Sequence, residues 1–184
     1  KEFATPDVLE QIRGLAGRLQ DKKILMINST NQGGGVAELL AGLVPLLNSL
    51  GVRTEWKVLT SRDGFFEVTK KIHNLLQGSE GVLTEAEKRV YQETNRLFAA
   101  DTDFSPYDLV VIHDPQPLPL VSFVKHRCPW LLEMHIDLTA PDPASFSFVC
   151  QVIEKYDGVV VSHQEFVKNE LVVLVLTVGH RREV

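Results

Sequence analysis

Three short polar stretches hold the residues whose types could do chemistry in this chain of 184 residues. The first carries a run of glycines that begins at Gly33, the second carries His113 and Asp114, and the third carries His135 and Asp137. Imidazole and carboxylate groups can bind divalent metals, and they can also hydrogen-bond the hydroxyls of a sugar, which donate and accept. Each stretch directly follows an apolar run typical of a strand, so we interpret all three as strand ends.

The glycine triplet Gly33, Gly34 and Gly35 comes directly before a predicted helix. Glycines there let the backbone approach a ligand closely and leave helix N-terminal N–H groups free for a phosphate or hydroxyl. The simpler interpretation is a tight turn between strand and helix. The spacing is not G-x-G-x-x-G, and no Lys-Ser/Thr follows as in a Walker loop. A nicotinamide site and an ATPase are therefore disfavoured, although Glu55 stands at about the distance expected for a ribose contact.

The two histidine–aspartate pairs leave several hypotheses open. His113, Asp114, His135 and Asp137 could together bind the metal of a metal-dependent hydrolase. The same groups could instead bind sugar hydroxyls, and either histidine alone could be a core residue with satisfied hydrogen bonds. Two prolines stiffen the loop after Asp114. We expect no metal and no other cofactor.

Other reactive residue types in the sequence suggest less. Ser162-His163 ends the last clear strand, but no G-x-S-x-G motif surrounds the serine, so we predict no serine nucleophile. Cys128 and Cys150 are too few for a disulfide framework and are interpreted as ordinary thiols. Phe65-Phe66 could form an aromatic sugar platform, but core packing explains the pair better.

The elements that must position these residues alternate between strand and helix. We predict strands over 23–28, 53–59, 107–113, 130–135 and 158–162, and helices near 5–19, 36–50, 65–76, 85–100, 118–125 and 144–156. The runs 109–112 and 159–161 are apolar throughout, which is typical of strands that helices cover on both faces. This alternation predicts an α/β fold with a doubly wound, Rossmann-like parallel sheet. Ligands of such sheets bind at the carboxyl ends of the strands, where the three polar stretches would meet.

Composition and charge fit one globular domain. The chain is 44% hydrophobic and 23% charged, with a net charge of -5, so it lacks the basic surface that nucleic acid binding requires. The longest apolar run, 171–176, is far shorter than the roughly 20 residues that span a bilayer. We expect a cytoplasmic protein with neither nucleic acid nor membrane as a partner, and we leave open whether it is a homo-oligomer.

The domain expected from this pattern covers residues 1–171. Residues 172–184 form an apolar segment that we assign to no element. An unpaired, β-prone segment promotes aggregation, so we predict that it pairs with the sheet or with another chain.

Longer motifs resemble the trehalose-forming glycosyltransferases, a family of retaining enzymes with the GT-B fold. The resemblance runs from about residue 23 to residue 171. Its motifs are NST (28–30), GGGVAELL (33–40), FFxVTK (65–70), HDPQP (113–117), HIDL (135–138) and VIEKYD (152–157).

This resemblance implies the N-terminal, acceptor-side half of a two-domain GT-B enzyme that transfers glucose from a nucleotide sugar to glucose. It implies that His135 contacts the sugar at the reaction centre and that the glycine loop approaches the donor phosphates or the transferred glucose. Asp114 and Gln116 would bind hydroxyls of the acceptor, and Asn28 would shape the loop. The substrate-binding residues it implies are Gly33, Gly34, Gly35, Asn28, Asp114, Gln116 and Asp137.

The family also has a second α/β domain, which is absent from this sequence and which supplies the nucleotide pocket and basic residues that neutralise the leaving phosphate. The resemblance therefore implies no metal, and it implies that the isolated chain binds sugar weakly and catalyses little. Two alternatives stay open: a non-catalytic sugar- or nucleotide-binding α/β module, and the metal-dependent hydrolase.

Overall fold

The computed structural model describes residues 5–59, 64–163 and 175–177, and these form an α/β fold around one parallel sheet. The strand order is β2-β1-β3-β4-β5-β6, and every neighbouring pair runs parallel. The strands are β1 (Lys23–Asn28), β2 (Arg53–Val58), β3 (Leu109–His113), β4 (Trp130–Met134), β5 (Gly158–Val161) and β6 (Val175–Thr177). The helices are α1 (Pro6–Gly17), α2 (Gly35–Ser49), α3 (Phe65–Leu76), α4 (Glu85–Asp101) and α5 (Pro143–Ile153), with a 3-10 helix η1 (Leu118–Ser122).

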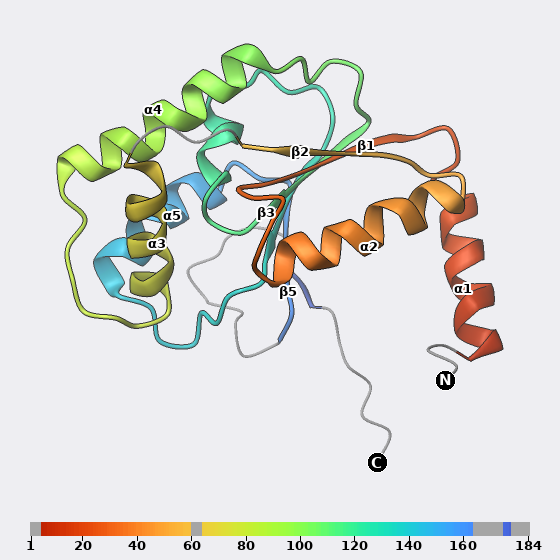
Figure 1. Cartoon of the computed structure of the whole chain (residues 1–184), viewed down its shortest axis with the longest axis horizontal. Coiled ribbons are helices and arrows are strands. Elements are labelled where there is room, and N and C mark those ends of the chain that lie inside the picture. Colours follow the sequence, from red (N-terminus) through yellow and green to blue (C-terminus); the bar gives the residue numbers. More distant parts are fainter. Residues whose placement is uncertain (1–4, 60–63, 164–174, 178–184) are drawn as a thin grey trace.

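Helices cover both faces of the sheet. The core under α3, α4 and α5 contains Leu25 and Trp130, whereas the core under α2 contains Met26, Leu40 and Val111. Neighbouring residues of one strand, such as Leu25 and Met26, therefore belong to different cores. Figure 1 shows α3, α4 and α5 gathered together, with α2 apart from them. The predicted doubly wound α/β sheet is confirmed.

Helix starts that the sequence predicts are found with their capping bonds. The hydroxyl of Thr84 accepts from the N–H of Glu87, and the Glu87 carboxylate accepts from the N–H of Thr84. Asp142 caps α5 by accepting from the N–H of Ser145 at 2.8 Å. The helix predicted near 118–125 is shorter: η1 is a 3-10 helix in which the N–H of Leu120 bonds the carbonyl of Pro117 at 3.0 Å.

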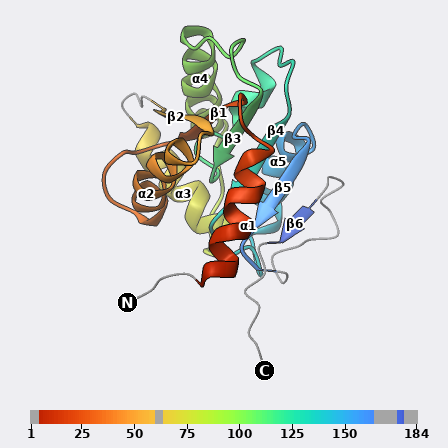
Figure 2. The same cartoon turned by 90° about the vertical axis from the view of Figure 1, so that its right-hand side faces the viewer.

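The apolar face of α1, which the sequence pattern would place against a core, is largely exposed in the structure. Val8 and Leu15 share one face of α1 by their spacing, yet they are 43% and 58% exposed. Among the residues of α1 only Ala16 is buried. Figure 1 shows α1 at one end of the molecule, and in Figure 2, which views that end, it stands in front of the other elements. The apolar spacing predicts the helix correctly, but it does not tell what covers that helix.

The segment 172–184, predicted to pair with the sheet or another chain, contributes one strand. β6 pairs in parallel with β5, and Val159 faces Val175 in the register. The rest of this segment lies outside the described residues. Within the described parts of the chain, no helix is both long enough and apolar enough to cross a membrane.

Candidate functional site

The carboxyl ends of β1, β3 and β4 lie side by side at one edge of the sheet, because these strands are parallel neighbours. The chain turns in opposite directions from β1, toward β2 on one side and toward β3 on the other. This topological switch point is where open α/β sheets bind ligands. We call residues 28–35, 113–116 and 133–137 the carboxyl-end rim. The expectation that the three polar stretches share one edge is confirmed.

Asn28 ends β1 and is only 3% exposed. Its amide nitrogen donates to the carbonyl of Thr30 at 2.7 Å, and its amide oxygen accepts from the indole of Trp56 at 2.8 Å. Its own carbonyl accepts from the N–H of Leu59 at 2.8 Å. These bonds fix the start of the glycine loop and tie it to β2.

The glycine loop is exposed and leads directly into α2. Gly33 and Gly34 have φ angles of 71° and 87°, a left-handed region that favours glycine, and Gly35 is the first residue of the helix. A Cβ atom at any of the three would meet no atom within 4 Å. The backbone conformation therefore requires glycine at the first two positions, while the open space leaves room for a ligand at the helix N-terminus.

His113 and His135 face each other at the centre of the rim. His113 Nδ1 lies 3.0 Å from His135 Nε2, and the rings stack at 15° with centroids 5.4 Å apart. The His113 side chain is fully buried, whereas that of His135 is 21% exposed. Burial first, and then the neighbouring His135, lower the pKa of His113 from 6.5 to about 3, so His113 is a neutral imidazole at physiological pH. His135 is the member of the pair that solvent and ligands can reach.

Glu133 joins this pair, and the sequence analysis did not find it. In the register of β3 and β4, His113 faces Glu133 directly. Glu133 and His135 are two residues apart, so their side chains share one face of the strand. Carboxylate oxygens of Glu133 lie 3.6 Å from His113 Nδ1 and 3.9 Å from His135 Nε2. Burial raises the pKa of Glu133, and Asp114 raises it further, although His135 opposes them.

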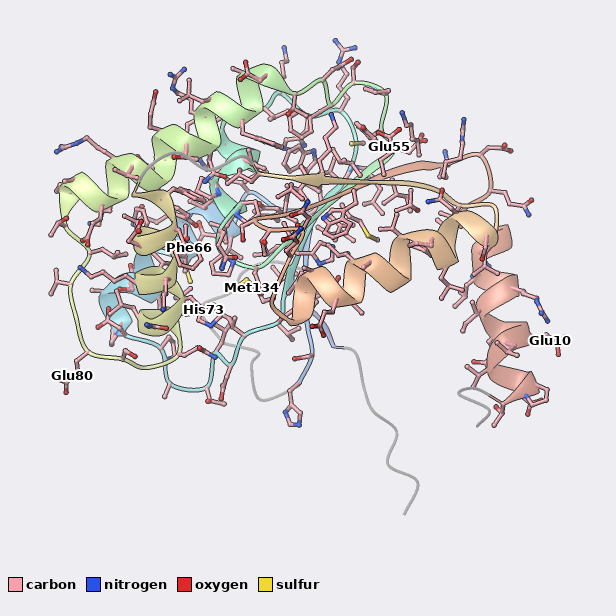
Figure 3. All side chains as sticks on the ribbon, viewed as in Figure 1. Glu10, Glu55, Phe66, His73, Glu80 and Met134 are labelled. Carbon is pink, nitrogen blue, oxygen red and sulfur yellow. The ribbon has the colours of Figure 1, made fainter. Side chains whose placement is uncertain are left out.

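Asp114 holds the backbone beside this cluster. It has a φ of 66°, which is unusual for a residue other than glycine. Its N–H donates to the carbonyl of Glu133 at 2.9 Å, and its carboxylate accepts from the N–H of His135 at 2.8 Å. Burial raises the pKa of Asp114, while His135 and His73 oppose that shift. His73, labelled on α3 in Figure 3, is through this effect on Asp114 a further neighbour of the rim.

Gln116 and Asp137 lie at the two ends of the rim. Gln116 is half-buried, and its carbonyl accepts from the Asn95 amide at 3.1 Å. The Tyr91 hydroxyl donates to the carbonyl of Pro115, and this hydrogen bond fixes the loop to α4. Asp137 is exposed and accepts from the N–H of Thr139 at 2.8 Å.

The four residues considered as metal ligands do not form one cluster. Among the described residues, the group of three whose ligand atoms all lie within 4.8 Å of one another is His113, Glu133 and His135, which contains two of the four residues considered. The carboxylates of Asp114 and Asp137 accept backbone N–H bonds instead. The ligand set considered from the sequence thus differs from the group that the structure brings together, in which Glu133 takes the place of the two aspartates because it faces His113 across β3 and β4.

Residues weighed for other roles lie apart from the histidine cluster. Glu55 stands in the first half of β2, where Lys23 and Tyr107 bind its two carboxylate oxygens, so it is not available for a ribose. Phe65 is buried in the core, as expected, whereas Phe66 is 67% exposed. Ser162 is exposed after β5.

Neither Cys128 nor Cys150 forms a disulfide within the described part of the chain, and Cys150 is buried. A cavity of about 730 Å³ lies at the amino ends of β3 and β4, where Tyr107, Cys128 and Trp130 are among its lining residues. It is at the opposite edge of the sheet from the rim and contains none of the rim residues.

The chain is similar to proteins named trehalose synthase and trehalose phosphorylase. A family model described as "Trehalose synthase, N-terminal domain" matches residues 26–168. The trehalose synthase of Thermococcus litoralis is 42% identical over 172 residues, which are 93% of this chain and 42% of that protein. The trehalose synthase of Rubrobacter xylanophilus is 37% identical over 161 residues, or 85% of this chain and 39% of that protein.

A trehalose phosphorylase of Pleurotus pulmonarius is 32% identical over 143 residues, which cover 67% of this chain and 19% of that protein. The chain thus spans well under half the length of the curated relatives that it matches. The match nevertheless runs from the second half of β1 through β5 and covers all of the carboxyl-end rim. The chain belongs to the family of trehalose synthase N-terminal domains, a trehalose-related domain of the glycosyltransferase type.

Proposed function

We propose that this chain is the acceptor-side domain of a retaining GT-B glycosyltransferase that transfers glucose from a nucleotide sugar to glucose. The observation that carries the proposal is the position of His135, which is half-buried at the switch point of the sheet in a chain 42% identical to a trehalose synthase. The His135 backbone N–H is bound by Asp114 and its ring stacks on His113, while the side chain stays 21% exposed, so this imidazole can hydrogen-bond a sugar hydroxyl in a defined direction.

In this proposal each rim stretch has one task. His135 contacts the glucose at the reaction centre, and the α2 N-terminus behind Gly34 attracts the donor phosphates. Gln116 and Asp137 bind acceptor hydroxyls. Asp114 acts mainly by holding the backbone of His135, since one of its oxygens already accepts that N–H.

A second domain is required for turnover in this proposal. Transfer with retention develops charge on the donor phosphates and on the sugar ring, and groups positioned for that charge supply much of the rate enhancement. The described residues of the rim carry no lysine or arginine. The partner of this domain would therefore be the source of the cations that stabilise the leaving nucleotide.

Ligand-dependent stability tests this function. Glucose, trehalose and a panel of nucleotide sugars are added to the purified chain, and thermal unfolding is followed. A ligand that binds only the folded state stabilises it by about 2.7 kcal/mol at 100 times its dissociation constant. We expect a shift with glucose or trehalose that His135→Ala removes.

The matched control is His126→Ala, which changes an exposed histidine at the opposite edge of the sheet. It should keep the full ligand shift. Stabilisation by nucleotides alone would favour the non-catalytic nucleotide-binding module. Ligand shifts that survive His135→Ala would contradict the assignment of the sugar site to this rim.

A further inference from the structure

The ring nitrogens of His113 and His135 and the carboxylate of Glu133 surround one small space on three sides. The separations are 3.0 Å between His113 Nδ1 and His135 Nε2, and 3.6 Å and 3.9 Å from Glu133 oxygens to those nitrogens. In a tetrahedral zinc site with bonds of about 2.0–2.1 Å, ligand atoms stand roughly 3.3–3.4 Å apart. The two Glu133 distances belong to different carboxylate oxygens, Oε2 and Oε1, and one ligand atom from each of the three side chains lies within 4.8 Å of the others. A side-chain rotation that brings one Glu133 oxygen nearer to both nitrogens would complete the geometry.

The donor set selects the class of ion. Two imidazole nitrogens and one carboxylate oxygen suit Zn²⁺ and its neighbours Co²⁺, Ni²⁺ and Cu²⁺, whereas Mg²⁺ and Ca²⁺ prefer oxygen ligands alone. We propose that His113, Glu133 and His135 form a binding site for one divalent transition-metal ion. Its fourth coordination position faces the carboxyl-end rim, on the exposed side of His135 and Glu133.

The charges around the cluster leave room for a cation. Among the described residues, no lysine or arginine forms an ion pair with Glu133 or with the neighbouring Asp114. A bound dication would place positive charge beside these two carboxyl groups.

One feature limits the affinity. His113 Nε2 is buried and has no hydrogen-bond partner among the described residues. When Nδ1 binds a metal, the proton of the neutral ring must lie on Nε2, and a buried unpaired donor weakens binding about 10- to 100-fold. Metal-ligating histidines usually donate that second N–H to a partner. The site therefore suits an ion that exchanges with solution, not a permanent structural ion.

Such an ion would also compete for the ring that the proposed function assigns to sugar. Because the ion takes His135 Nε2, a sugar would meet the ion or its bound water instead of the free imidazole. The metal proposal does not need the sugar proposal, since it rests only on the three side chains.

Metal titration of the purified chain tests the site. After treatment with EDTA and its removal, Zn²⁺ binding is measured by calorimetry and Co²⁺ binding by visible absorption. We expect one ion per chain and the intense visible bands of tetrahedral Co²⁺. Glu133→Gln and His135→Ala, both at half-exposed positions, should each weaken binding at least tenfold.

Controls separate the site from adventitious binding and from misfolding. His73→Ala removes a histidine near the rim but outside the ligand set, and it should leave Co²⁺ binding unchanged. Circular dichroism checks that each variant is folded, which matters most for the buried His113→Ala. Absence of stoichiometric binding, or equal Zn²⁺ affinity in wild type, Glu133→Gln and His135→Ala, would overturn the proposal, whatever the sugar titrations give.

Discussion

Asp114 is the residue on which the geometry of the rim depends most directly. Its left-handed backbone is strained for a residue with a Cβ, and such conformations cost about 1–3 kcal/mol and persist only where the surroundings enforce them. Here its N–H binds the carbonyl of Glu133 in β4, and its carboxylate binds the N–H of His135, which directly follows that strand. We therefore regard Asp114 as a positioning residue that sets where the His135 ring stands.

Two substitutions at Asp114 should separate its backbone role from its charge. Asp114→Ala leaves the His135 N–H without its acceptor and keeps the strain, so the free energy of unfolding should fall by about 2 kcal/mol. Asp114→Asn retains an acceptor oxygen and a side chain that tolerates positive φ, so the loss should stay below about 1 kcal/mol. Urea denaturation measures both, and equal losses would show that the charge matters more than the hydrogen bond.

At the scale of elements, α3 and α4 are joined through one carboxylate. Glu87 caps α4 with Thr84 and also accepts from Lys71 of α3 at 2.8 and 2.9 Å. These hydrogen bonds, from Lys71 first and then from Thr84, lower the pKa of Glu87 from 4.5 to about 2. α3 also carries His73, which lies near Asp114 of the rim. The contact between Lys71 and Glu87 therefore affects the site as well as stability.

The lowered pKa of Glu87 makes the stability that this carboxylate contributes depend on pH. In the unfolded chain Glu87 takes up a proton near pH 4.5, whereas in the folded chain it does so near pH 2. Its stabilisation is therefore complete above about pH 5 and declines as the pH falls toward 2. Glu87→Gln should cost about 1 kcal/mol at pH 7, since its side chain is partly exposed, and clearly less at pH 2.5. Thermal unfolding at both pH values checks this, and a constant cost would argue against the ionised carboxylate.

The elements also show what local sequence can and cannot predict. Continuous apolar runs predict β3 and β5, and the motif at Thr84 predicts the start of α4, because these signals arise within a few residues. The contact between His113 and Glu133 depends on the register of two strands separated by 16 residues, which no local pattern reports. The backbone role of Asp114 likewise follows from a φ angle that neighbouring residue types do not predict.

At the scale of the whole molecule, the two faces of the sheet differ in how completely they are covered. The α3–α4–α5 side forms one large core, whereas the opposite side has a smaller one and α1 leaves Val8 and Leu15 exposed. α1 has the apolar spacing of an amphipathic helix, but the described residues cover few of its apolar side chains. Stability should therefore depend weakly on the apolar face of α1 and strongly on α2.

Matched leucine substitutions test this difference. Leu40→Ala removes a fully buried side chain of α2 and should cost about 2–5 kcal/mol. Leu15→Ala removes a side chain that is 58% exposed and should change the free energy of unfolding by no more than about 0.5 kcal/mol. Alanine suits both sites because it is a good helix former. A large cost at Leu15 would mean that another part of the protein covers α1.

The register of β3 against β4 also has a consequence for how this chain can change in evolution. The histidine–carboxylate cluster is assembled across strands, and side chains on a strand alternate between its two faces. Insertion or deletion of one residue within β4 would turn Glu133 toward the opposite helix layer while leaving the residue itself in the sequence. Loops at the rim can vary in length without this effect. Descendants of this domain should therefore tolerate changes of length beside the site far more readily than a single-residue change within the strand that carries it.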